Sequence, residues 1–178
     1  MTKYNIRYVL GISLIGALGG FLFGYDWVVI GGAKPFYEKF FFISDIPRMQ
    51  GWVMSSALLG CILGAMSSGV FSNRFGRRVS LFVAAFLFTT SAIGTGASNT
   101  LSWFVFFRIW GGIGIGLASS VSPIYISEVS PATLRGRFVS INQLTIVIGI
   151  LLAQIVNWLI AKPVPADADA QYILESWN

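Results

Sequence analysis

Two charged residues, Asp26 and Arg108, lie within long apolar stretches of the sequence. A charge inside a membrane is costly, so such residues are functional candidates. A carboxyl group favours its charged form beside an arginine and its neutral form in apolar surroundings. If Arg108 approached or left Asp26 as the protein changed shape, proton binding would depend on conformation. The pair therefore predicts a proton-coupling site. A salt bridge that only locks two helices is the alternative.

Other residue types restrict the chemistry further. The sequence has no histidine and a single cysteine, Cys61, which lies in an apolar run. It contains no pairing of serine with histidine, no cysteine pair and no spacing typical of metal ligands. We therefore expect no enzymatic activity, no catalytic residue, no bound metal and no cofactor.

The elements that position these charges are predicted to be membrane helices. Charged residues make up 11% of the chain, against about 25% in an average soluble domain, and the mean hydropathy is +0.74. A membrane helix needs about 20 mostly apolar residues. Uncharged runs of at least 18 residues predict five such helices, near residues 8–31, 50–71, 79–98, 102–126 and 138–161. Residues 162–178 are polar and predict a loop.

The basic residues predict the orientation of the chain. A net charge of +5 is also seen in nucleic-acid-binding proteins, but here the basic residues flank the apolar runs. With the N-terminus in the cytosol, seven lie in inner segments and four in outer ones. Cytosolic loops carry the excess of Lys and Arg in membrane proteins. The sequence therefore predicts a cytosolic N-terminus and an external loop at 162–178, with no nucleic acid as partner.

The depths of the two intramembrane charges are compatible with pairing. Asp26 lies 19 residues after Arg7, which is about 28 Å along a helix that climbs outward. Arg108 lies about 9 Å into a helix that descends from the outer face. Both residues are therefore expected in the outer half of the membrane.

Glycines recur within three of the predicted helices. Close pairs and four-residue spacings give a helix a thin face against which another helix can pack. A dinucleotide-binding loop would need a strand before the glycines, whereas these lie within uncharged runs. We therefore predict close helix packing at Gly16, Gly19, Gly20, Gly24, Gly60, Gly64, Gly111, Gly112, Gly114 and Gly116.

Four strings together resemble the sugar porter family of the major facilitator superfamily. They are GGFLFGYD (19–26), NRFGRR (73–78), RIWGGIGIGLASSVSPIYISEVSPATLRGR (108–137) and NQLTIVIGILLAQ (142–154). The resemblance implies a twelve-helix fold in two six-helix halves, with a monosaccharide bound between them and alternating access by rocking of the halves. The chain would then be five helices of the N-terminal half, and 162–178 would lead to a missing sixth helix. We expect such a piece to need the C-terminal half of the same protein for transport.

The resemblance also assigns residues to a sugar site and to a cytosolic gate. Gln143 matches a sugar-binding glutamine of the family. Ile146 and Ile150 follow it on the same or an adjacent helix face. Phe23 lies three residues before Asp26 and is a candidate for lining the cavity, with plain packing as the alternative. The implied gate is a charge cluster that holds the outward-open state, formed by Arg74, Arg78, Glu128, Arg135 and Arg137. Asn73 stands where the family often has an acid.

Two residues disagree about the transport mechanism. The resemblance links an acid at the position of Asp26 to proton-coupled import. Some proton-coupled members carry a second glutamine at the position of Ile150, so the aliphatic residue favours a facilitative uniporter. A drug:proton antiporter is less favoured, because the fifth predicted helix has Gly149 and no proline. The sequence therefore predicts sugar:proton symport in the plasma (inner) membrane. A uniporter and a non-transporting membrane fragment are the alternatives.

Overall fold

The computed structural model describes residues 6–161, and five long helices account for most of that range. They are α1 (Ile6–Phe40), α2 (Pro47–Phe75), α3 (Arg77–Gly96), α4 (Leu101–Val129) and α5 (Arg135–Ala161). Each helix is long and apolar enough to cross a membrane. The predicted all-α membrane fold of five helices is therefore confirmed. The predicted external loop at 162–178 lies outside the described residues.

The first helix is longer than the charge pattern predicted. It continues to Phe40 instead of ending near residue 31. Its last turns carry Lys34 and Glu38, which form an ion pair of 3.6 Å four residues apart. Charges mark where a helix leaves the apolar layer, whereas backbone hydrogen bonding decides where the helix ends. The sequence pattern therefore located the edge of the apolar stretch and not the end of α1.

A tight connection joins α2 to α3. Gly76 alone separates the two helices, and its φ angle is +86°. This left-handed region is readily available to glycine and rarely to other residues. Glycine at this position therefore allows α3 to begin at Arg77, directly after the turn.

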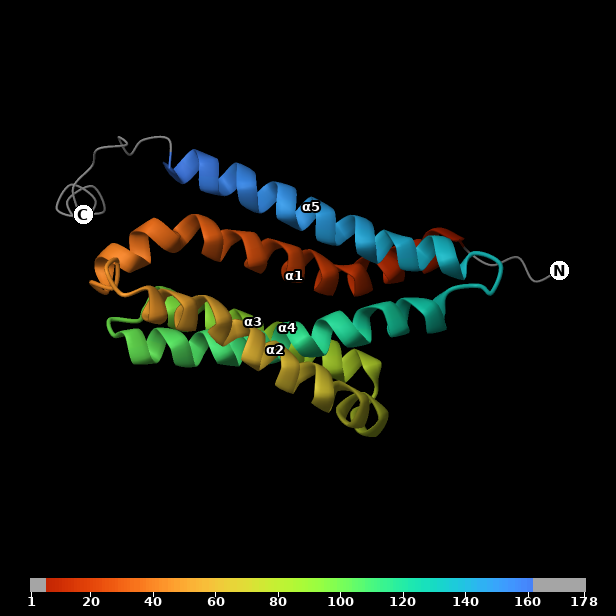
Figure 1. The fold of residues 1–178 in the computed structure, drawn as a ribbon. Coiled ribbons are helices and arrows are strands. Elements are labelled where there is room, and N and C mark those ends of the chain that lie inside the picture. The colour runs from red at the N-terminus through yellow and green to blue at the C-terminus, as the bar shows by residue number, and fades with distance from the viewer. Residues whose placement is uncertain (1–5, 162–178) are drawn as a thin grey trace.

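Helix α4 lies at the centre of the bundle and is the most buried of the five described helices. It packs against α2, α3 and α1, and more lightly against α5, while α5 lies along α1. Consecutive helices run in opposite directions (Figure 1). Two of the closest pairs, α1 with α5 and α2 with α4, are therefore parallel pairs.

These two pairs are built in the same way, by glycines that face backbone carbonyls. On α2, Gly60 faces the carbonyl of Ile109, and on α4, Gly112 faces the carbonyl of Ala57. The same reciprocal contact joins the other pair: Gly24 of α1 faces the carbonyl of Ile146, and Gly149 of α5 faces that of Phe21. A Cβ at any of these glycines would meet a backbone oxygen that cannot move aside. The predicted close packing of helices at glycines is therefore confirmed for Gly24, Gly60 and Gly112.

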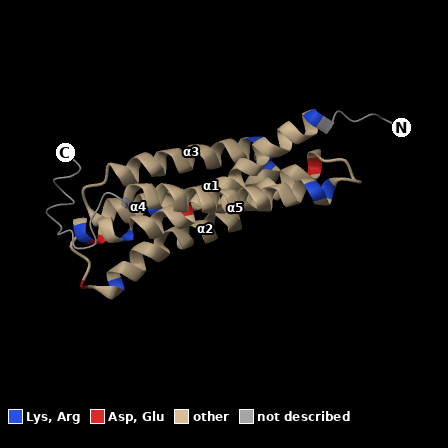
Figure 2. Cartoon of the chain, turned by 90° about the horizontal axis from the view of Figure 1, so that it is seen from above, with Lys and Arg blue, Asp and Glu red and all other residues tan. Residues whose placement is uncertain are grey.

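The outer surface of the bundle is apolar along its length. Phe82, Met66 and Val70, on α3 and α2, are each at least 74% exposed. Figure 2 shows the charged residues gathered near the two ends of the bundle, with few between them. Large apolar side chains at this exposure suit a lipid environment, in which all backbone polar groups must be satisfied within helices. The protein is an integral membrane protein.

Candidate functional site

The two intramembrane charges meet between α1 and α4. The Arg108 Nη1 donates to both carboxylate oxygens of Asp26, at 3.2 Å each. The side chains are 9% and 22% exposed, respectively. The structure thus brings together two residues that stand 82 positions apart. One guanidinium nitrogen bridging a carboxylate leaves the other donors of Arg108 for further partners.

Small residues allow α1 and α4 to approach each other below the pair. Gly19 faces the side chains of Ser122 and Ala118 on α4. The Ser122 hydroxyl donates to the backbone carbonyl of Gly16. Because these contacts hold the two helices side by side, the carboxylate and the guanidinium, about two to four turns away, can reach each other.

An aromatic and aliphatic cluster lies on the side of the pair toward the connection between α1 and α2. Ile30 and Tyr37 of α1 and Phe104 of α4 are buried together there. The Tyr37 and Phe104 rings lie 5.6 Å apart between centroids. Apolar cover of this kind excludes water and strengthens the interaction between the two charges.

The predicted sugar-site residues lie on α1 and α5. Phe23, Ile146 and Ile150 are half-buried, and Gln143 is exposed. A cavity of about 500 Å³ lies between α1, α3 and α4, and none of the four lines it. In the described part of the chain, these four residues therefore do not line this cavity.

The predicted gate residues lie at the end of the bundle where α1 begins. Glu128 accepts a hydrogen bond of 3.0 Å from Arg77 Nε, and this ion pair joins α4 to α3. Arg77 also donates to the Asn73 side chain and to the Ser72 carbonyl, both at 3.3 Å. Asn73 thus acts as an acceptor in the cluster.

Arg77 is not one of the predicted gate residues, and the four predicted gate arginines make no ion pair with Glu128 in the described part of the chain. Arg74 lies over the ring of Phe75, at 5.7 Å from its centroid. Arg78 lines the cavity between α1, α3 and α4. Arg135 and Arg137 are exposed in the first turn of α5. The structure thus brings one arginine, Arg77, to Glu128 among the residues described.

The sequence analysis assigned Arg74 and Arg78 to the gate and not Arg77, because spacing alone does not show which arginine of one short turn reaches Glu128. Arg77 is the first residue of α3, directly after Gly76 with its positive φ. Tyr37 was also missed. Tyr37 lies among charged residues beyond the predicted span at 8–31, where the sequence gives no signal that separates a site residue from packing.

Polar side chains of α5 attach that helix to the backbone of α1. Thr145 donates to the Ala17 carbonyl at 2.9 Å, and Asn157 donates to the Val28 carbonyl at 3.0 Å. Because Asn157 also occupies the space that a Cβ at Gly32 would need, it fits only against a glycine. These two bonds hold α5 in register beside Asp26 without using a charge.

Comparison with known proteins assigns the family. The model of the family described as "Sugar (and other) transporter" matches residues 12–174. The chain belongs to this family. The sequence resemblance to sugar porters is thereby confirmed.

Three relatives of this sugar transporter family illustrate the likeness. The glucose transport protein of Synechocystis sp. is 49% identical over 157 residues, which are 88% of this chain and 33% of that protein. The D-xylose-proton symporter of Escherichia coli K12 is 42% identical over 185 aligned positions, covering 90% of this chain and 38% of that protein. A solved structure of the proton:xylose symporter XylE, bound to 6-bromo-6-deoxy-D-glucose, superimposes with a TM-score of 0.85 at 41% identity and covers 92% of this chain and 39% of that one.

The solved structure belongs to the major facilitator superfamily. The predicted fold class is therefore confirmed. The chain spans about a third of the length of the curated relatives that it matches.

Proposed function

We propose that this chain is the N-terminal part of a monosaccharide:proton symporter that works by alternating access. The observation that supports it most directly is the Asp26–Arg108 pair, bonded at 3.2 Å between α1 and α4. A carboxylate held by a nearby guanidinium binds a proton when the guanidinium withdraws. Relative motion of α1 and α4 would therefore change proton binding together with access.

The sugar is proposed to contact α1 and α5. The Gln143 amide supplies donors and an acceptor for sugar hydroxyls, while Phe23 supplies an aromatic face for the sugar's C–H surface. Ile146 and Ile150 form the apolar wall between them. Gln143 is exposed on α5, and so it is available to a ligand. The relatives are about three times longer than the match, which supports a C-terminal half that completes the site.

The gate is proposed at the opposite end of α4. Glu128 and Arg77 form its bonded centre. Arg74, Arg78, Arg135 and Arg137 surround that end and would exchange with Arg77 as partners of Glu128 when α4 moves. Their crowding on one end supports a cluster that closes the cytosolic side.

The orientation and location are part of the proposal. Six basic residues of the described chain lie at the end of the bundle that holds the start of α1, and three lie at the other end. This excess supports a cytosolic N-terminus in the plasma (inner) membrane. Cysteine-accessibility labelling should find position 77 accessible from the cytosol. Position 168, which is not among the described residues, should be accessible from the external side. Labelling of position 168 from the cytosol alone would overturn this orientation.

The transport proposal is tested with Asp26→Asn in a full-length protein that contains this sequence. The variant keeps the shape of the side chain but cannot titrate. At 100 mV, one coupled charge supplies about 2.3 kcal/mol, which is close to a fifty-fold concentration ratio at about 1.4 kcal/mol per decade. The parent should accumulate labelled sugar in vesicles under a proton gradient, and the variant should stop near equal concentrations.

A facilitative uniporter is the second candidate, and the aliphatic side chain of Ile150 favours it. A uniporter never accumulates sugar above equilibrium, with or without a proton gradient. Accumulation by Asp26→Asn, or its absence in the parent, would replace symport with this candidate.

A further inference from the structure

Tyr37 is a buried tyrosine that neither the sequence motifs nor the proposed transport site includes. It is 6% exposed, on the outer half of α1. Its ring packs against Phe104, but its hydroxyl has no hydrogen-bond partner among the described residues. Buried polar groups are normally paired, and an unpaired one calls for an explanation.

A complementary unpaired atom lies on the neighbouring helix. The Nε–H of Arg108 is also buried and without a partner among the described residues, while Nη1 of the same guanidinium holds Asp26. Nε–H can only donate, and a tyrosine hydroxyl oxygen can accept. The two unpaired atoms therefore match each other in chemistry.

The helix geometry brings these two side chains toward each other. Phe104, on which Tyr37 packs, lies one turn before Arg108 on α4. Long side chains on a helix point toward the N-terminus of their own helix. This direction takes the Tyr37 side chain from Phe104 toward the level of Arg108, because α1 and α4 run in opposite directions (Figure 1).

We propose that Tyr37 is a positioning residue for the proton-coupling pair. Its hydroxyl accepts the Nε–H of Arg108 through one bridging water, and so holds the guanidinium with Nη1 on both oxygens of Asp26. The bond anchors Arg108 from the outer side while Asp26 anchors it from the inner side. This role deepens the proposed symport, since it assigns the residue that sets how firmly Arg108 stays on the carboxylate.

Few other charges face this group. On α1, Glu38 is paired with Lys34 at 3.6 Å. On α2, Cys61 is the titratable residue within the span, and Asp45 and Arg48 near the start of that helix are exposed. The span of α5 from residue 138 to 160 has no titratable residue. Glu38, whose buried Oε1 has no hydrogen-bond partner among the described residues, is therefore a neighbouring charge that remains when the Tyr37 hydroxyl is removed.

The experiment compares Tyr37→Phe with the parent in a full-length protein that contains this sequence. The substitution keeps the ring on Phe104 and removes only the hydroxyl. With Arg108 held less firmly, the Asp26 carboxylate should bind its proton more tightly. The infrared signal of the protonated carboxyl, assigned by its loss in Asp26→Asn, should reach half its maximum at a pH higher by about 0.5 to 1. The pH profile of sugar accumulation should move in the same direction.

Two further variants separate positioning from packing. Tyr125→Phe removes a tyrosine hydroxyl elsewhere in the bundle and should leave the infrared midpoint unchanged. Phe104→Leu disturbs the packing of Tyr37 without touching its hydroxyl, and should lower thermal stability with a smaller midpoint change. Tyr37→Phe should also lower the thermal unfolding temperature, because it removes a hydrogen-bonded hydroxyl. Removal of a buried hydroxyl with no partner would instead raise that temperature.

An unchanged infrared midpoint in Tyr37→Phe, or a gain in thermal stability, would overturn the inference. The infrared titration does not depend on transport. If the parent fails to accumulate sugar while the Tyr37→Phe midpoint still shifts, symport fails and the positioning role stands.

Discussion

The protein contains two interhelical ion pairs that share their chemistry and differ in their surroundings. Asp26 and Arg108 join α1 to α4 with side chains 22% and 9% exposed. Glu128 and Arg77 join α4 to α3 with side chains 47% and 32% exposed. The distances are similar, at 3.2 and 3.0 Å, so distance does not distinguish them. Burial does, because the energy of separating charges rises steeply as water is excluded.

This difference suits two different tasks. A buried pair is strongly destabilised when one partner is lost, so its state can be controlled by a single proton. An exposed pair contributes little in any one arrangement, so it can open and re-form with other arginines at low cost. The first property suits proton coupling, and the second suits a gate that must switch.

The largest expected effect comes from leaving the buried carboxylate without its partner. Arg108→Leu should reduce the free energy of unfolding by about 3–5 kcal/mol, because Asp26 would remain in apolar surroundings with no counter-charge. Denaturant unfolding in detergent micelles measures the loss. Adding Asp26→Asn to the same chain removes the lone charge and should restore most of the stability. If Arg108→Leu alone changed the free energy of unfolding by less than about 1 kcal/mol, the Asp26–Arg108 pair would behave like an exposed ion pair.

A smaller effect on stability is expected at the other pair. Glu128→Gln should change the free energy of unfolding by about 0–1 kcal/mol, because both side chains are already hydrated. Its effect should appear in the conformational balance, since several arginines lose a shared anionic partner. External accessibility of the cavity, measured by labelling, should fall relative to the parent. If accessibility does not change, Glu128 only anchors the end of α4.

The smallest expected effect is the response of the two pairs to salt. Double-mutant cycles isolate the coupling energy of each pair. Raising the ionic strength from about 0.15 M to 1 M shortens the screening length from about 8 Å to 3 Å. The coupling between Arg77 and Glu128 should then become too small to measure, and that between Arg108 and Asp26 should be retained. Equal sensitivity of both couplings would remove the distinction drawn from burial.

The sequence predicted much of this architecture because its strongest signals are one-dimensional. Runs without charge determine spans, so five helices were found, and intramembrane charges stand out, so Asp26 and Arg108 were found. The end of α1 at Phe40 was not predictable from charge gaps, because the helix continues beyond the apolar layer. The pairing of Arg77, and not Arg74 or Arg78, with Glu128 depends on how α3 packs against α4, which no spacing rule contains.

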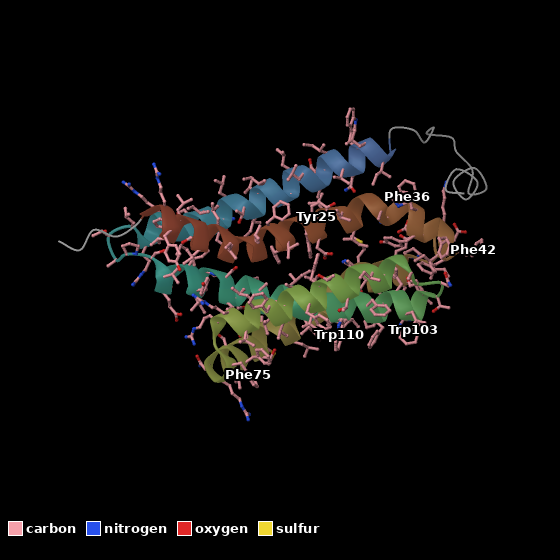
Figure 3. The ribbon with its side chains drawn as sticks, turned by 180° about the vertical axis from the view of Figure 1, so that it is seen from behind. Tyr25, Phe36, Phe42, Phe75, Trp103 and Trp110 are labelled. Carbon is pink, nitrogen blue, oxygen red and sulfur yellow. The ribbon has the colours of Figure 1, made fainter. Side chains whose placement is uncertain are left out.

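Tyr37 shows a further limit of sequence patterns. Its proposed role rests on two buried atoms without a hydrogen-bond partner among the described residues, the Tyr37 hydroxyl on α1 and the Arg108 Nε on α4, and no sequence pattern shows that a hydroxyl is unpaired. In Figure 3, tyrosines, phenylalanines and tryptophans occur on several helices, at Tyr25, Phe36, Phe75, Trp103 and Trp110 among others. Aromatic residue type alone therefore cannot separate a positioning residue from lipid-facing or packing residues.

The glycine contacts bear on how the bundle can deform. Where Gly112 meets the carbonyl of Ala57, or Gly24 that of Ile146, main chain touches main chain, and no side-chain rotamer is available to absorb a displacement. At the boundary between α1 and α4 the corresponding glycine, Gly19, meets side chains instead. The two parallel pairs are thus mechanically stiff, and the compliant boundary is the one between them. The Asp26 carboxylate, proposed to bind the proton, lies on that boundary, where a small shear would change the electrostatic force on it.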